Sequence, residues 1–405
     1  MFIEKAVLPI LGRPATTIRS EGCSPLVTTA TPLRRSLITP TTLVLVALVA
    51  IAFYFLLQRF LYGLGAVANI NPGYPWGIWV VVDVIIGTAF GCGGFAMGLL
   101  VYIFNRGKYH PLMRPALLSG LFGYTLGGFA VIFDLGRYWQ AYNLLLPWYA
   151  QLNSVMYEVA LCVMAYVVVL WIEFSPAFLE RVGMAGIKRI LERWMFVIVA
   201  LGVLLPTMHQ SSLGSMLLVM GYRLSPLWFT MWLPALFVIS ALAMGYAVVM
   251  FEATVVSKTF ALPSEHALIS KMSVVVGWIT VGWLVLRWGD LIARDVLPLA
   301  FVGSTKVLMF WIENALFVAA ALVFITPAGR ASQRASFLGA VALLAGGSLY
   351  RLDAYLIGYQ PISNWSYFPS VPELMVSIGV VALEVLLYLI FIKTLPVLHG
   401  DAARR

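Results

Sequence analysis

Ten long runs of apolar residues divide this chain, and short polar segments separate them. An α-helix needs about 20 apolar residues to cross roughly 30 Å of hydrocarbon. The predicted spans, numbered one to ten, cover residues 41–61, 75–104, 112–136, 152–174, 190–210, 226–252, 268–291, 305–327, 335–357 and 371–396. The pattern therefore predicts an all-α integral membrane protein.

A short internal echo predicts how the spans are grouped. Span three ends Phe133-Asp134-Leu135-Gly136-Arg137 and span seven ends Arg287-Trp288-Gly289-Asp290, while spans two and six both open on closely spaced tryptophans. Both pairs are four spans apart, as in membrane proteins built from repeated bundles. We expect two four-helix bundles, spans two to five and six to nine, with spans one and ten flanking them.

Three parts are expected along the chain. Residues 1–40 are rich in Thr, Pro and Arg and are predicted to be a flexible cytoplasmic N-terminal arm. Residues 41–397 form the membrane domain, and residues 398–405 form a cytoplasmic tail. The first 40 residues lack an early apolar core with a small-residue cleavage site, so we predict no signal peptide.

The distribution of basic residues predicts the orientation. Of the 26 Lys and Arg residues, 19 lie in the arm, in the tail or in the loops on the same side. The positive-inside rule then places both termini in the cytoplasm of a bacterium, with the spans in its inner membrane. The opposite loops are aromatic, and we expect an interfacial belt there that contains Trp139, Trp148, Trp228, Trp365 and Tyr367.

Composition excludes several other classes of protein. The chain is 61% hydrophobic and 11% charged, and its net charge of +9 is spread over loops, so no nucleic-acid partner is expected. None of the three cysteines forms a Cys-x-x-Cys pair, so no iron–sulfur or structural zinc site is predicted.

Ionisable residues within the spans gather toward the non-cytoplasmic side. A charge at the bilayer centre costs about 2.5–3.5 kcal/mol, so such residues usually face a bundle interior and mark an ion, proton or substrate site. The residues at or near the outer ends of their spans are Asp134, Arg137, Glu158, His209, Arg287, Asp290 and Arg351. They predict a polar pocket that opens toward the outer face.

Further carboxylates lie deeper in the spans. Asp83 follows Pro75 by eight residues, Glu384 lies near mid-membrane and Glu252 lies at a cytoplasmic end. Together with Glu158, their spacing indicates a proton path across the membrane.

Some of these residues allow a structural interpretation as well as a functional one. His209 is either a protonatable hydrogen-bond donor to a quinone carbonyl or a helix-end histidine satisfied by the backbone. Glu158 is either a proton acceptor or the partner of Arg137 or Arg351 in an ion pair. Asp134 and Arg137 are one turn apart and are expected to pair with each other.

The histidine count bears on cofactors. Only four histidines exist, and His209 alone lies within a span. A membrane b-type haem usually takes two histidines from facing helices. We therefore expect neither a haem nor a metal in this chain.

Small residues cluster in spans two and three. Gly91-Cys92-Gly93-Gly94 lies in span two, and Gly123-Tyr124-Thr125-Leu126-Gly127-Gly128 lies in span three. We expect these clusters to let the two helices approach closely.

A series of motifs, in order over residues 60–397, resembles the NrfD/PsrC family and, within it, the HybB-type membrane subunits of nickel–iron uptake hydrogenases. The motifs are Gly63-Leu64-Gly65 to Asn71, Tyr74-Pro75-Trp76-Gly77-Ile78-Trp79 with Asp83, Asn105-Arg106-Gly107-Lys108-Tyr109-His110-Pro111, Phe133-Asp134-Leu135-Gly136-Arg137-Tyr138-Trp139, Asn153-Ser154-Val155-Met156-Tyr157-Glu158, Pro206-Thr207-Met208-His209-Gln210-Ser211-Ser212, Phe251-Glu252, Tyr367-Phe368-Pro369 and Leu395-Pro396.

The resemblance implies a function. Members are quinone-reacting subunits, without haem or metal, that dock a periplasmic four-cluster iron–sulfur subunit and reduce menaquinone or ubiquinone, or oxidise its quinol, near the outer leaflet. In the hydrogenase type, a nickel–iron large subunit and a small iron–sulfur subunit supply the electrons from hydrogen. The resemblance ties His209 and Glu158 to quinone and proton chemistry, and Glu252 to an inner proton path.

The candidate site follows from both lines of argument. Catalytic roles are expected for His209, Glu158 and Asp134; quinone contacts for His209, Trp76, Asp83, Arg137 and Gln210; and proton transfer for Glu158, Asp83, Glu384 and Glu252.

Two alternatives remain open. The first keeps the family and replaces hydrogenase by a sulfur, sulfite or molybdenum enzyme. The second is a secondary transporter, for which Gly or Pro interruptions at mid-membrane are the expected feature. Pro75 and Pro206 fall near predicted span ends, which disfavours the transporter.

Overall fold

A computed structural model describes residues 32–33 and 35–398 of the chain. Most of the predicted N-terminal arm, and the predicted tail after Leu398, lie outside the described residues. The described part contains ten helices long and apolar enough to cross a membrane, so the prediction of an all-α, multi-pass membrane protein is confirmed. Within it no β-strand forms, and a single antiparallel bridge joins Leu224 to Tyr359.

The ten spans have the following bounds. They are α2 (Pro40–Tyr62); η2 (Val80–Ile86), α3 (Gly87–Phe90), α4 (Gly93–Gly98) and η3 (Leu99–Ile103), which together form span two; η4 (Gly107–Leu112) with α5 (Met113–Asp134); α6 (Val155–Val182); α7 (Ala185–Met220); α8 (Leu233–Phe260); α9 (His266–Ala293); α10 (Thr305–Ile325); α12 (Gln333–Leu352) with η8 (Asp353–Ile357); and α13 (Val371–Thr394). Short helices lie between them: η1 (Leu64–Ala66), η5 (Tyr138–Leu145), η6 (Gly221–Arg223), η7 (Leu297–Phe301) and α11 (Pro327–Ala331).

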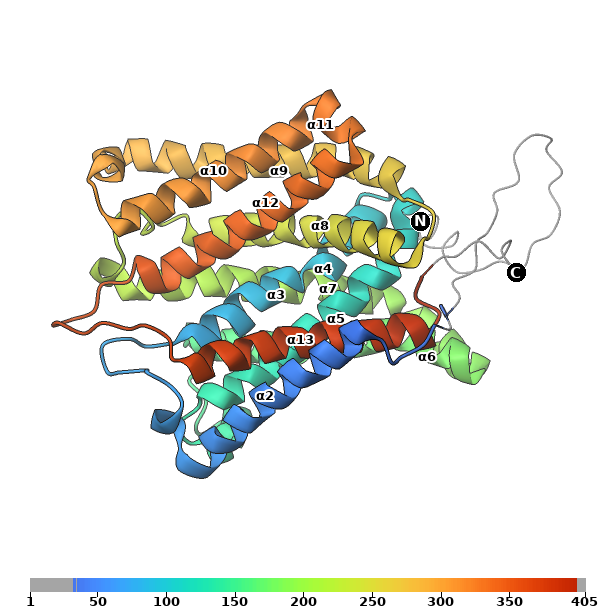
Figure 1. Ribbon diagram of the computed structural model, residues 1–405, viewed down its shortest axis with the longest axis horizontal. Helices are drawn as coiled ribbons and strands as arrows, with labels where there is room; N and C mark the ends of the chain where they lie inside the picture. Colours follow the sequence, from blue (N-terminus) through green and yellow to red (C-terminus); the bar gives the residue numbers. More distant parts are fainter. Residues whose placement is uncertain (1–31, 34, 399–405) are drawn as a thin grey trace.

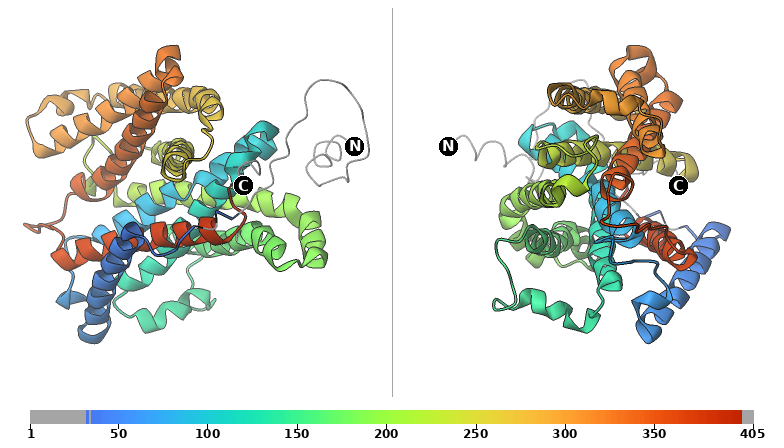
Figure 2. Two further views of the ribbon diagram at one scale, coloured as in Figure 1. Left: turned by 45° about the vertical axis from the view of Figure 1, so that its right-hand side comes forward. Right: turned by 90° about the vertical axis from the view of Figure 1, so that its left-hand side faces the viewer.

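The helices form two bundles that share one long interface. Span two, α5, α6 and α7 contact one another in a ring, and α8, α9, α10 and α12 form a second ring. The α8 helix also contacts α4 and α7 and so joins the two rings, while α2 and α13 pair with each other against α5 (Figure 1). Figure 2 shows the same grouping from two further directions. The predicted arrangement of two four-helix bundles with spans one and ten beside them is confirmed.

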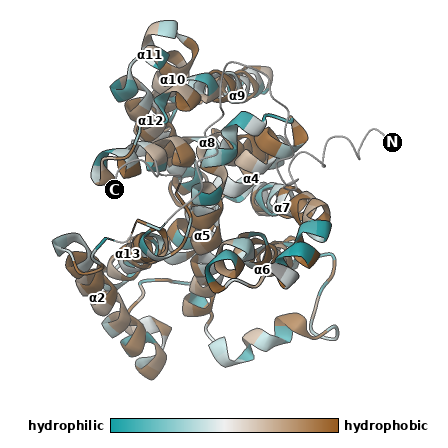
Figure 3. Ribbon diagram, turned by 90° about the vertical axis from the view of Figure 1, so that its right-hand side faces the viewer, coloured by the Kyte–Doolittle hydropathy of each residue, from teal (hydrophilic) through white to brown (hydrophobic). Residues whose placement is uncertain are grey.

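Two faces of the molecule are used below to describe depth. The termini face is the side on which α2 begins and α13 ends, at the right of Figure 1. The loop face is the opposite side, where α5 and α7 end. Figure 3, viewed from the termini face, shows apolar residues over most of the helix surfaces, as contact with lipid requires.

The helices α6 and α7 are longer than predicted. The α7 helix has 36 residues, which at about 1.5 Å per residue give roughly 54 Å. Since the hydrocarbon layer is about 30 Å thick, part of this helix must lie outside it. Figures 1 and 2 show the turn between α6 and α7 extending past the neighbouring helices on the termini face.

Span two is interrupted inside the membrane. Two π-helical segments, η2 and η3, flank it, and a turn at Gly91 and Cys92 separates α3 from α4. Neighbouring glycines allow other helices to approach this turn. A Cβ atom on Gly120 of α5 would lie 2.7 Å from the Gly91 carbonyl oxygen, and one on Gly245 of α8 would lie 2.5 Å from that of Cys92. The glycine clusters of spans two and three do permit close packing, as predicted.

We expect Gly245→Ala to destabilise the protein by about 1–3 kcal/mol, because its methyl group would overlap the Cys92 backbone. Thermal unfolding in detergent measures the effect. Gly282→Ala is the matched control, since Gly282 also lies within a helix and a Cβ atom added there would meet nothing within 4 Å. Equal melting temperatures for the two variants would contradict the argument.

Candidate functional site

His209 lies deep in the first bundle. The α7 helix continues past it to Met220, so the prediction that His209 closes span five is wrong. The polar residues after it remain helical because their side chains bond to their own helix: Ser212 donates to the Met208 carbonyl (2.9 Å) and Ser215 to that of Ser211 (3.1 Å). His209 is fully buried, roughly 16 Å from the helix end on the loop face.

A hydrogen-bond network fixes the orientation of the imidazole. The Thr88 hydroxyl donates its single proton to the Val84 carbonyl (2.5 Å). Its oxygen therefore accepts from Gln210 Nε2 (3.2 Å) and from His209 Nε2 (3.1 Å). It follows that neutral His209 carries its proton on Nε2. Its Nδ1 atom has a free lone pair and no hydrogen-bond partner in the described part of the chain.

Two residues from other helices complete this group. The Tyr124 ring of α5 stands edge-on to the His209 ring, with 5.7 Å between centroids, and its hydroxyl lies 3.5 Å from Cys92 Sγ. We call Cys92, Thr88, Tyr124, His209 and Gln210 the histidine cluster. Sequence reasoning did not single out Thr88 or Tyr124, because neither carries a charge within its span.

Asp83 lies closer to the loop face. It sits in the π-helix η2, is 4% exposed, and neither of its carboxylate oxygens has a hydrogen-bond partner among the described residues. Asp134 and Glu384 are the carboxyls that act on it electrostatically. A π-helical turn in a membrane helix is a common feature of functional sites. The structure thus brings together three acids from different spans.

Asp134 does not pair with Arg137, so that prediction is wrong. Arg137 is exposed, and the cation beside Asp134 is Arg59 of α2. Arg59 donates to the carbonyls of Phe133 (2.6 Å) and Leu135. These carbonyls lack partners within α5 because they lie at its C-terminal end, which also attracts positive charge through the helix dipole.

Glu158 stands apart from the other candidates. It lies in the first turn of α6 and is partly exposed, and no ion pair joins it to Arg137 or Arg351 in the described part of the chain. A carboxylate in this position favourably opposes the helix dipole. Arg351 instead donates to the Phe237 carbonyl (3.1 Å) and to Ser240 (3.3 Å).

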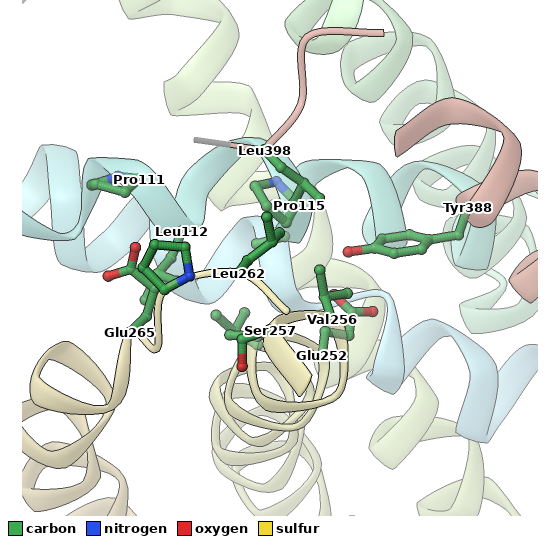
Figure 4. A pocket seen from close by; sticks show the side chains of 14 residues that line it. Pro111, Leu112, Pro115, Glu252, Val256, Ser257, Leu262, Glu265, Tyr388 and Leu398 are labelled. Atoms are coloured by element: carbon green, nitrogen blue, oxygen red, sulfur yellow. The ribbon is translucent and has the colours of Figure 1, made fainter. Parts of the chain in front are cut away.

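A pocket connects the termini face with Glu252 of α8. Its residues come from η4, α5, α8, α13 and the α8–α9 loop. Glu252 and Tyr388 line it, and Figure 4 shows both side chains at one end with Glu265 at the other. Burial raises the pKa of Glu265 above its ordinary value. Glu384 acts electrostatically on Glu252, as it does on Asp83, so it lies between the two.

Several aromatic residues on the loop face have structural roles. Trp76 is buried and donates to the Tyr355 carbonyl (2.8 Å), which joins span two to η8. Tyr367 donates to Glu373 (2.7 Å), and burial and this hydrogen bond raise its pKa. Trp228, predicted to lie in the interfacial belt, is fully buried and donates to Glu313 (3.0 Å), so that prediction is wrong.

These features define a polytopic membrane protein with buried ionisable groups inside a helical bundle. The match to a family model then identifies the chain. Residues 66–360 match the family described as "Polysulphide reductase, NrfD", and the chain belongs to this family.

Three relatives extend the match over nearly the whole chain. The probable Ni/Fe-hydrogenase 2 b-type cytochrome subunit of Escherichia coli (strain K12) is 41% identical over 370 residues, which are 91% of this chain and 94% of the relative. A protein of Nitratidesulfovibrio vulgaris (strain Hildenborough) is 30% identical over 383 residues, 90% of this chain and 96% of the relative. The menaquinone reductase integral membrane subunit of the same organism is 26% identical over 378 residues, 84% of this chain and 87% of the relative. The resemblance to the hydrogenase type of this family is confirmed.

The expectation that this chain lacks haem is contradicted. The relative from Escherichia coli is named a b-type cytochrome subunit, and that name implies haem. The residues fit the usual pair of histidine ligands only in part. His209 has a free Nδ1 atom, but the other described histidines, His110 and His266, lie where their helices begin on the termini face. No step below passes through a haem.

We expect neutral His209 to be the Nε2–H tautomer, because the Thr88 oxygen has only acceptor capacity left for it. Solid-state NMR of ¹⁵N-histidine-labelled protein measures this, since only four histidines contribute and His209→Gln identifies the signal. Thr88→Val should shift that signal, whereas Thr280→Val, a buried threonine bonded only to its own helix, should not. A proton on Nδ1 would contradict the network.

Proposed function

We propose that this chain is the quinone-reactive membrane subunit of a respiratory complex. It would pass electrons between an iron–sulfur partner outside the membrane and the quinone pool. The observation that carries the proposal is the fully buried His209, whose Nδ1 atom is free within a polar cluster of an NrfD-family bundle.

The names of two relatives support this role. One is named an integral membrane subunit of a menaquinone reductase, and the other a subunit of a nickel–iron hydrogenase. On this basis the substrate is a quinone, menaquinone or ubiquinone, and the electrons come from hydrogen. The proposed partners are a periplasmic four-cluster iron–sulfur subunit on the loop face and the large and small hydrogenase subunits.

His209 has the geometry for hydrogen bonding to a quinone head group. Its Nδ1 atom can accept a hydrogen bond from a quinol hydroxyl and, once protonated, can donate to a quinone carbonyl. The Oε1 atom of Gln210 is also buried without a partner among the described residues and offers a second acceptor. Reduction of the quinone consumes two electrons and two protons, so the site needs a proton supply.

The line of acids supplies a route for these protons. Asp83, near Asp134 on the loop-face side, interacts with Glu384, and Glu384 interacts with Glu252. Glu252 lines the pocket that opens on the termini face. With both termini in the cytoplasm of a bacterium, as the basic loops favour, protons would enter from the cytoplasm. Glu158 lies outside this route.

The alternatives are affected differently by the structure. A transporter was disfavoured because its helix interruptions were absent from the sequence pattern, yet span two is interrupted and Pro206 lies within α7. Membership of the NrfD family favours the redox role over transport. A molybdenum or sulfur enzyme remains the alternative electron donor, and a selenate reductase subunit of Mesobacillus selenatarsenatis, 23% identical over 208 residues, supports it.

We expect His209→Ala to lower quinone reduction by the whole complex on the order of 100-fold, because a proton-transferring group contributes at least this much. Reduction of a soluble dye by the partner enzyme should be unchanged. His266→Ala is the control, since His266 bonds only to a backbone carbonyl at the helix start. Normal quinone reduction in the His209 variant would refute its assignment.

We expect Glu252→Gln to slow proton uptake on the termini face by about tenfold or more, because glutamine cannot relay a proton. Proteoliposomes with a pH-sensitive dye measure the uptake during quinone reduction. Glu192→Gln serves as the control, because Glu192 is an exposed carboxylate that pairs with Lys188. Uptake at the wild-type rate would exclude the route through this pocket.

A further inference from the structure

The second bundle encloses two carboxyls and one guanidinium that the proposed quinone chemistry does not use. Glu313 lies on α10, Asp353 begins the π-helix η8 and Arg287 lies on α9, and all three side chains are 0% exposed. Arg287 Nη2 is 4.0 Å from Glu313 Oε1. Asp353 and Glu313 face each other closely enough to interact directly.

Glu313 is surrounded by hydrogen-bond donors. Trp228 Nε1 donates to its Oε2 (3.0 Å) and Asn314 Nδ2 to its Oε1 (3.5 Å). With Arg287 beside it, donors face both oxygens, which is the environment of an ionised carboxylate.

Asp353 has no comparable partners. Both of its oxygens lack a hydrogen bond in the described part of the chain, as do the three guanidinium nitrogens of Arg287 and the hydroxyl of Tyr350. Buried polar atoms are almost always satisfied by protein or by ordered water. The group is therefore built to hold water between polar atoms that cannot reach one another.

The charges in this group do not balance without a further positive charge. Among the other charged residues near it, Asp290 already pairs with Arg294 (2.7 Å), and Arg351 donates toward Phe237 in the bundle interface. One guanidinium thus stands beside two buried carboxyls. An unpaired charge at this depth is costly, and a metal cation would be repelled by Arg287.

We propose that Glu313 and Asp353 form a second protonation site, in which the two carboxyls and bound water share one proton beside Arg287. The bound proton brings the net charge of the group to zero. The shared proton resides mainly on Asp353, whose O–H donates toward Glu313 directly or through water. This site does not depend on quinone binding at His209.

The site has polar neighbours in two directions. Toward the loop face, Thr230 donates to Asp290 (2.8 Å), one helical turn from Arg287. Toward the first bundle, Tyr350 interacts with both Arg287 and Arg351, and Arg351 in turn acts on His209. A proton held here is therefore close enough to affect the charge state of the histidine cluster.

Infrared spectroscopy of the full-length chain in lipid nanodiscs tests the proposal directly. A protonated carboxylic acid gives a C=O stretching band that shifts in D₂O and is absent for a carboxylate. We expect Glu313→Gln and Asp353→Asn each to remove the same single band, because the remaining carboxyl then pairs with Arg287 in its ionised form. The double variant should lose nothing more.

Arg287→Gln provides an independent test. Without the guanidinium both carboxyls should be protonated, so a second band should appear. Asp290→Asn is the matched control and should leave the spectrum unchanged, since Asp290 is ionised in its pair with Arg294. Two separate bands, each lost in one variant, or no band lost in either variant, would overturn the proposal. A spectrum unaltered by Arg287→Gln would also overturn it.

Discussion

The backbone of span two cannot face lipid, and much of the fold follows from that constraint. A turn within the hydrocarbon leaves backbone groups that only surrounding protein or water can satisfy. In span two, 78% of the most apolar window is buried, compared with 11% in α2, which lies at the edge of the molecule. Glycines on α5 and α8 bring backbone against the turn and leave no room for lipid. The same enclosure keeps the histidine cluster and Asp83 away from lipid.

Hydropathy alone was enough to predict the architecture. Each span is a run of residues that must be apolar to insert, so the number, order and grouping of the helices could be taken from the sequence. The deep acids could also be recognised, because a carboxylate such as Glu384 is rare in an apolar run and stands out. Where an ionisable residue lies along its span is harder to predict. Pro206 and the polar residues after His209 resemble a helix end, yet the side chains bond back into the helix and it continues.

Partnerships between spans were beyond the reach of the sequence. Spacing suggested that Asp134 pairs with Arg137, three residues away, but the cation beside it is Arg59, from another span. Thr88 and Tyr124 acquire their importance only because α3 and α5 place them against α7. The expectation about haem failed for a different reason: it counted histidines, whereas the name of a close relative implies haem.

The hairpin of α6 and α7 has a consequence for experiments on whole membranes. Its turn extends past the neighbouring helices, and ion pairs from Glu180 to Arg114 and Lys188 hold its base. Trp194 of α7 is 63% exposed, at the depth where tryptophan usually meets the lipid head groups. The basic residues before it then lie in water. Trypsin added to sealed vesicles of known sidedness should cut there first, so this hairpin is a built-in reporter of topology.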